Sequence, residues 1–145
     1  MPQYVKSVVI DAPVEKVFSF HERDDALALL TPGFPPVRLI RKTGGIAVGA
    51  TVVLRVGVFR WIALHTAYEK DRLFVDEQVS GPFSKWVHRH EFESFGMRTR
   101  LTDRIDYELP GGRWVNRLLN WAVLPGLANM FAHRHRVTKG LCEAA

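Results

Sequence analysis

Residues 86–92 read Trp86-Val87-His88-Arg89-His90-Glu91-Phe92, and this alternation decides the fold. Successive side chains of a β-strand point to opposite faces, so the aromatic and histidine side chains share one face. Arg89 and Glu91 lie on the other face, which we assign to solvent. One buried and one solvated face is typical of an antiparallel sheet that is covered on one side.

The next β-rich run, residues 98–109, shows the same alternation. Its charged residues fall on one face, which we also assign to solvent: Arg98, Arg100, Arg104, Asp106 and Glu108. The opposite face then points to the core and carries Thr99, Leu101, Asp103, Ile105 and Tyr107. Only a short turn separates the two runs, so we expect them to be antiparallel neighbours.

Working outward, further β-rich runs cover residues 4–10, 37–42, 51–58, 61–69 and 73–79. Two short helices are expected after the first strand, up to about Phe20 and over about residues 24–30. A long helix over about residues 113–141, bent near Pro125, ends the chain. This order predicts a single α+β domain over residues 1–145, with a curved antiparallel sheet of about six to seven strands wrapped around the long C-terminal helix.

The pairing of four strands is set by three short turns: residues 70–71, 81–83 and 95–96. With these turns His65 faces Asp76, Asp76 faces His88, and His88 faces Asp103. The four side chains then form one row on the inner face of the sheet. A further turn at Phe59-Arg60 places Val58 and Trp61 on that same face.

Ionised carboxylates are costly inside an apolar core unless they are paired, and alternating histidine and aspartate is a way to pair them. Two interpretations stay open: a buried polar network that satisfies itself, or the polar groups of a ligand pocket. In the second case the candidate ligand-binding residues are Trp61, His65, Asp76, Gln78, Trp86, His88, His90, Asp103 and Tyr107.

Metal binding and catalysis have weaker support. Neighbouring strands lie about 4.8 Å apart, so the ends of the row would be about 14 Å apart, too far to share one ion. No metal-ligand spacing motif is present, and we predict neither a metal nor another cofactor. If the protein is an enzyme, His88 with Asp103 is the candidate general base and its orienting carboxylate. Without a nucleophile motif, the sequence favours binding over catalysis.

Composition limits the cellular setting and the partners. Cys142 is the single cysteine, which excludes an internal disulfide and favours the cytoplasm. The apolar stretch 118–132 is shorter than the ~20 residues of a membrane span, so we expect no stable membrane insertion. The basic segment 133–136 suits the end of the last helix, where cations oppose the helix dipole, and we expect no nucleic-acid partner. A homodimer is left open.

Several segments resemble a known superfamily. Ile10-Asp11-Ala12-Pro13-Val14-Glu15-Lys16-Val17-Phe18 resembles the opening of the START/birch-pollen-allergen-like superfamily, often called SRPBCC. Its bacterial ligand-binding branch, near the polyketide cyclase/dehydrase-like group, is similar in three further segments: Phe74-Val75-Asp76, Gly81-Pro82-Phe83 with residues 86–92, and Thr102-Asp103 through Tyr107 to Pro110.

The resemblance implies a helix-grip fold, in which the long helix lies in the concave sheet and encloses a cavity for lipids, polyketides or similar molecules. It implies a hydrophobic small-molecule partner, or alternatively a cyclase or dehydratase acting on a polyketide-like substrate. Catalytic and non-catalytic members share this scaffold, so the function has to be argued from the site. Pro125-Gly126 departs from the continuous helix of the superfamily.

Overall fold

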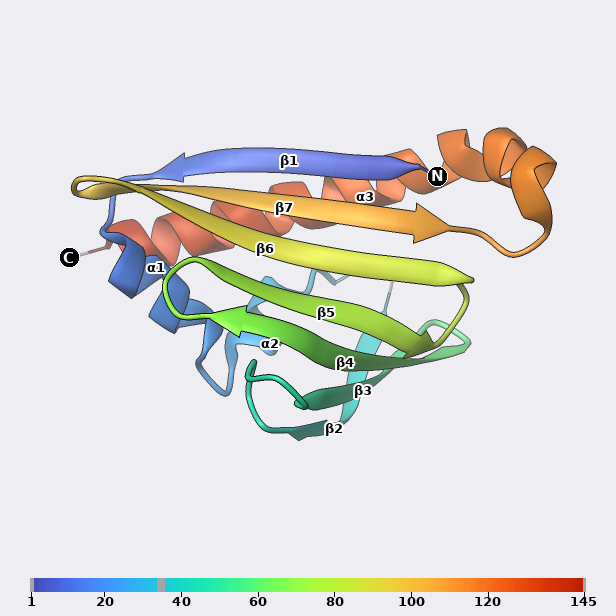
Figure 1. Ribbon diagram of the computed structural model, residues 1–145, viewed down its shortest axis with the longest axis horizontal. Helices are drawn as coiled ribbons and strands as arrows, with labels where there is room; N and C mark the ends of the chain where they lie inside the picture. The colour runs from blue at the N-terminus through green and yellow to red at the C-terminus, as the bar shows by residue number, and fades with distance from the viewer. Residues whose placement is uncertain (1, 34–35, 145) are drawn as a thin grey trace.

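A seven-stranded sheet forms one layer of the computed structural model, which describes residues 2–33 and 36–144 (Figure 1). All its strand pairs are antiparallel, in the order β1-β7-β6-β5-β4-β3-β2. The strands are β1 (Gln3–Ile10), β2 (Val37–Thr43), β3 (Thr51–Val56), β4 (Phe59–Glu69), β5 (Leu73–Ser80), β6 (Lys85–Phe95) and β7 (Arg98–Glu108). The first and last strands in the chain are thus neighbours, as the helix-grip fold requires.

Three helices complete the structure: α1 (Val14–His21), α2 (Ala26–Leu30) and α3 (Gly112–Glu143). Figure 1 shows α3 passing behind β1 and β7, with α1 and α2 near its C-terminal half. The predicted helix-grip fold is confirmed, including the two short helices. The long helix runs through Pro125 without a break, although proline has no amide hydrogen to donate there. Within the described residues, no helix has the length and apolar character to cross a membrane.

The face of the sheet that turns toward α3 holds the core, in two clusters. One joins α1 to the sheet through Phe18, which packs edge-on against Phe74 and Phe92. The other joins α3 to the sheet, because Phe131 packs with Trp86, Ile105, Tyr107 and Leu127. The inward faces predicted for β6 and β7 are buried throughout, so the alternation identified them correctly.

The turn between β6 and β7 differs from the prediction. Phe95 pairs with Arg98, so the turn is Gly96-Met97 and not Phe95-Gly96. Gly96 has a φ of 60°, the left-handed conformation that a type II′ turn requires at its first central position. The register therefore shifts by two residues: His90 lies opposite Asp103, and His88 lies opposite Ile105.

The turn between β3 and β4 also has a glycine with positive φ as its first central residue, and it also differs from the prediction. Val56 pairs with Phe59, which makes Gly57-Val58 the turn, with Gly57 at a φ of 59°. Val58 is 84% exposed at the tip, so its predicted inward position is wrong. Trp61 keeps its predicted face, because it pairs with Leu54 on the neighbouring strand.

The turn between β4 and β5 is one residue longer than predicted. Glu69 pairs with Leu73, and Asp71 adopts a left-handed φ of 62°. A β-bulge between His65 and Ala67 absorbs the extra residue. His65 therefore still faces Asp76, and Asp76 faces His88, as the turns predicted.

Candidate functional site

Five buried or half-buried polar side chains meet between the sheet and α3. They are Asp76 from β5, His88 and His90 from β6, Asp103 from β7 and His135 from α3. We call these residues the His–Asp cluster. Asp103 accepts hydrogen bonds from Nε2 of His88 at 2.7 Å and from Nε2 of His135 at 2.5 Å. Asp76 and His90 are joined by a hydrogen bond of 2.9 Å between Oδ2 and Nε2.

Three of the four residues of the predicted row, Asp76, His88 and Asp103, meet in the cluster, and one predicted pairing is wrong. His88 and Asp103 are not directly opposite, yet their side chains meet on the inner face because they lean toward each other along the strands. His90 is the residue directly opposite Asp103, and it also joins the cluster, since its Nδ1 lies 3.3 Å from Oδ1 of Asp103. His65 lies at the edge, with Nδ1 3.3 Å from the carbonyl of Ala50.

Both carboxyl groups of the cluster are held ionised. Burial alone would raise the pKa of Asp76, but the hydrogen bond to His90 and the charges of His88 and His90 lower it to about 2. Burial also opposes ionisation of Asp103, and its hydrogen bonds to His135, His88 and His90 bring its pKa well below the usual range. The sheet thus carries two negative charges on opposite sides of the His88 and His90 rings.

The two histidines of β6 differ in basicity although they are neighbours on one face. Burial, and then the closeness of His90, lowers the pKa of His88 in spite of the bond to Asp103. For His90, burial is outweighed by the bonds to Asp103 and Asp76, which raise its pKa. A third histidine, His21 of α1, has its ring centroid 6.4 Å from that of His90. Burial lowers the pKa of His21 to about 4, so its imidazole stays neutral.

His135 is the member of the cluster that the sequence did not reveal. The basic segment 133–136 was assigned to the end of the helix, but α3 continues to Glu143, so the dipole explanation is wrong. His135 is 4% exposed and faces the sheet. The guanidinium carbon of Arg134 lies 5.2 Å from the ring centroid of Phe131. Phe131 and His135 are four residues apart and both buried, a helical spacing that does signal an inward face.

The other predicted ligand-binding residues lie beside the cluster. Trp86 and Tyr107 are buried in the core, and Trp61 packs edge-on against Trp86 with ring centroids 5.0 Å apart. Gln78 turns to the loop that follows its strand: its amide nitrogen donates to the carbonyl of Phe83, and its oxygen accepts from the Phe83 amide. Gln78 therefore fixes the β5–β6 loop through both its amide nitrogen and its amide oxygen.

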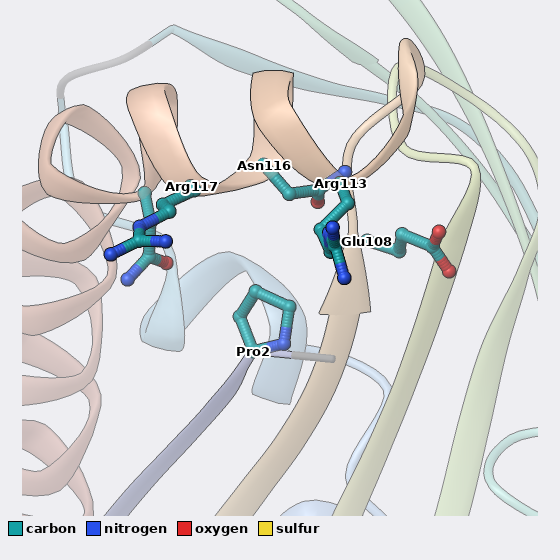
Figure 2. Close-up of a pocket in the computed structure, with 6 residues that line it drawn as sticks. Pro2, Glu108, Arg113, Asn116 and Arg117 are labelled. Atoms are coloured by element: carbon teal, nitrogen blue, oxygen red, sulfur yellow. The ribbon is translucent and has the colours of Figure 1, made fainter.

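One pocket of about 540 Å³ lies outside the cluster, where β7 leads into α3 (Figure 2). Its lining is largely polar and charged: Pro2, Glu108, Arg113, Asn116, Arg117 and Asn120. Asn116 ties the junction together, because its side chain bonds to the amide and carbonyl of Leu109. The pocket's charge makes it a poor match for an apolar molecule.

A second pocket of about 410 Å³ lies between α2 and the strands β2 and β3. Among the described residues that line it, only Thr31 has a polar side chain; the others are Leu27, Ala28, Pro32, Gly33, Pro36, Val37, Leu39 and Leu54. We call it the α2 pocket. The sequence did not point to it, because its walls come from segments that meet only through the fold. The apolar Leu27 and Leu54 were the available signal.

The sequence matches the family model described as polyketide cyclase/dehydrase and lipid transport over residues 10–136. No match was found among curated proteins. Three solved structures illustrate the similarity in fold.

A nucleoside-diphosphate sugar epimerase from Corynebacterium glutamicum aligns with a TM-score of 0.77 and 25% identity, over 94% of this chain but only 28% of the epimerase. The Zhui aromatase/cyclase from a Streptomyces species aligns with a TM-score of 0.76 and 14% identity, over 98% of this chain and 93% of the other. A START superfamily protein from Mycobacterium smegmatis aligns with a TM-score of 0.63 and 19% identity, over 93% and 96%.

Proposed function

Because the chain belongs to the polyketide cyclase/dehydrase and lipid transport family, we propose that it binds one small hydrophobic molecule between the sheet and the helices. The SRPBCC resemblance seen in the sequence is confirmed by this family and by the fold. The structural neighbours contribute the fold alone to this proposal. The epimerase in particular is matched over about a quarter of its length, so its activity is not carried over.

The α2 pocket is the observation that carries the proposal. Its volume of about 410 Å³ and its apolar walls are those of a site for a small molecule. Leu54 in its wall pairs with Trp61, and residues directly opposite share a face of the sheet. A molecule that enters beside α2 therefore meets the concave face at Trp61, and Trp61 leads on to Trp86 and His88.

We propose that some of the predicted ligand-binding residues line this path. Trp61 and Trp86 would contact the apolar body of the ligand, and the His–Asp cluster would lie at its inner end and orient a polar group. The pocket as it stands reaches only the start of the path, since Trp86, His88 and Asp103 are each at most 7% exposed. A ligand that reaches the His–Asp cluster would therefore need the side chains of Trp61 and Trp86 to move aside.

A cyclase or dehydratase activity through His88 and Asp103 is the second candidate. The hydrogen bond of 2.7 Å between them has the geometry of a base and its orienting carboxylate. A general base, however, needs a free nitrogen within reach of the substrate. Nε2 of His88 is bonded to Asp103. Nδ1 makes no hydrogen bond within the described residues, but His88 is only 3% exposed, so a substrate cannot reach that nitrogen in this structure. Binding is thus the better supported function.

A single charge in the wall of the α2 pocket tests the proposal. Leu39 is 46% exposed, so Leu39→Arg should fold normally and place a guanidinium at the pocket. Saturable 1:1 binding of an uncharged apolar fluorescent probe to the wild type should weaken at least about tenfold, because an apolar ligand would leave that charge poorly solvated. Val79→Arg is the matched control: Val79 is 63% exposed on another strand and lines neither pocket. Equal affinities of the two variants would contradict the α2 pocket as the binding site.

The setting of this function is also a proposal. We place the protein in the cytoplasm on the evidence of its single, buried cysteine, Cys142. We propose the small molecule as its principal partner, with no role for nucleic acid.

A further inference from the structure

The two histidines of β6 present an unusual arrangement of nitrogen atoms. Nε2 of His88 donates to Oδ1 of Asp103, and Nδ1 of His90 lies 3.3 Å from the same oxygen. The opposite nitrogens, Nδ1 of His88 and Nε2 of His90, both face Oδ2 of Asp76, at 3.7 Å and 2.9 Å. Two imidazole nitrogens and one carboxylate oxygen therefore converge on a common point.

We propose that Asp76, His88 and His90 form a binding site for a first-row divalent transition metal ion. One ligand atom from each residue lies within 4.8 Å of the other two. In a tetrahedral site with bonds of about 2.0–2.1 Å, ligand atoms are about 3.3 Å apart. Adjustments of an ångström or less bring the three atoms to that spacing, without any change of strand register.

Asp103 supplies the outer shell that such a site requires. Histidines that bind metals usually donate their other ring N–H to a carboxylate, which fixes the ring and the tautomer. Asp103 occupies this position for both His88 and His90, and His135 donates to its second oxygen. His88, His90, Asp103 and His135 are buried and Asp76 is half-buried, so the rings are held by packing as well as by hydrogen bonds.

Charge also fits a divalent ion. Neutral imidazoles leave Asp76 and Asp103 as two buried negative charges, and such charges are costly unless they are compensated. A divalent cation would compensate the charges of the two carboxylates, and it would replace the proton shared between Nε2 of His90 and Oδ2 of Asp76. The guanidinium of Arg134 lies over Phe131 on α3 and contributes a positive charge from the helix side.

The ligand types select the class of metal. Imidazole nitrogen suits zinc, copper, iron and nickel, whereas magnesium and calcium prefer sites made of oxygen alone. Two histidines and one carboxylate also leave at least one coordination position for water or for a group on a bound molecule. The sequence argument against a metal considered the straight row of four residues, whose ends are too far apart. His90 replaces the distant members and makes the site compact.

Zinc titration of the full chain, purified without a histidine tag and stripped with a chelator, tests the site. The wild type should bind one Zn²⁺, and Asp76→Asn and Asp103→Asn should each weaken binding at least about tenfold. His133→Gln removes a histidine outside the cluster and should leave the affinity unchanged. Failure of the wild type to bind one equivalent would overturn the proposal, as would equal losses in all three variants.

A measurement on the wild type alone guards against variants that do not fold. In long-range ¹H–¹⁵N spectra, Zn²⁺ should shift Nδ1 of His88 and Nε2 of His90, while the opposite nitrogens stay protonated. Shifts confined to His133, or to no histidine, would refute the site. Neither result depends on whether the α2 pocket takes up a hydrophobic molecule, so the two proposals stand or fall separately.

Discussion

Asp103 accepts more of the buried hydrogen bonds than any other carboxylate in the described residues, and its ionisation depends on them. A charge of this kind is tolerated because its partners come from three directions: two from β6 and one from α3. Removing the charge of Asp103 should lower the free energy of unfolding by more than one hydrogen bond contributes, because its histidine partners remain buried without an acceptor. At the scale of single residues, the interior is therefore a network in which one substitution affects several side chains.

Asp103→Asn should lower the free energy of unfolding by about 2–4 kcal/mol, since it breaks a buried ionic network while nearly keeping the shape. Urea denaturation at neutral pH measures the change. Asp106→Asn is the matched control on the outward face of the same strand, where the pair with Arg89 is partly solvated. It should cost about 1 kcal/mol or less. Similar losses in both variants would mean that the cluster contributes no more than a surface pair.

Cys142 makes a prediction about pH. Burial raises the pKa of its thiol to about 11, so the native protein should react slowly with iodoacetamide at pH 8.5, where the unfolded chain reacts readily. A thiol whose folded pKa is raised stabilises the fold at low pH and loses that contribution as pH rises through the folded value. The free energy of unfolding should thus fall between about pH 9 and pH 11. Labelling of native and denatured protein at equal rates would show that the thiol is exposed.

At the scale of elements, α3 has two parts with different surroundings. Its C-terminal part packs on the sheet through Phe131 and His135, whereas its first turns leave Trp114, Leu118 and Trp121 about 70% exposed. Figure 1 shows these first turns beyond the ends of β1 and β7. The exposed residues recur at helical spacing, so they form one apolar stripe. The helix is therefore anchored by its second half.

Phe131→Ala should destabilise the protein by about 3–5 kcal/mol, because it empties a fully buried aromatic site. Leu118→Gln, also on α3, should change the free energy of unfolding by about 0.5 kcal/mol or less. Thermal or urea unfolding of the two variants checks the contrast. A large loss from Leu118→Gln would show that the first turns are packed in solution, against a partner or a second copy of the chain.

The elements also show how far the sequence can be taken. Alternation in residues 86–92 and 98–109 was enough to identify the buried faces, because burial follows directly from the two-residue period of a strand. The exact pairing depended on where each glycine stands in its turn. In the structure, Gly96 and Gly57 each occupy the first central position of a turn. The predicted turns had Gly96 in second place and left Gly57 outside, so the predicted register of both hairpins was shifted.

Contacts between residues far apart in the sequence were harder to predict. The contact of His135 with Asp103 depends on how α3 is rotated over the sheet, and no local pattern sets that rotation. The α2 pocket depends in the same way on how a five-residue helix docks beside β2 and β3. The sequence could therefore predict which strands carry the site but not the helix residues that complete it.

At the scale of the whole molecule, the core between the sheet and the helices contains two groups of packed aromatic side chains. In the first group, Trp61, Phe83 and Trp86 pack against one another with ring centroids 5.0–5.7 Å apart. In the second, Phe18 of α1 packs edge-on against Phe74 and Phe92. The α2 pocket is lined by Leu54, which pairs with Trp61 of the first group. An apolar ligand would thus enter beside α2 and meet the aromatic groups before it reaches the charged cluster.

Native mass spectrometry of the freshly purified full chain tests this account most directly. We predict one small apolar molecule bound per chain, retained by Val79→Arg and lost from Leu39→Arg, because only the second variant places a charge in the α2 pocket. Wild-type protein that carries no such molecule, and that takes up none in 1:1 ratio when offered fatty acids or aromatic polyketides, would contradict the account.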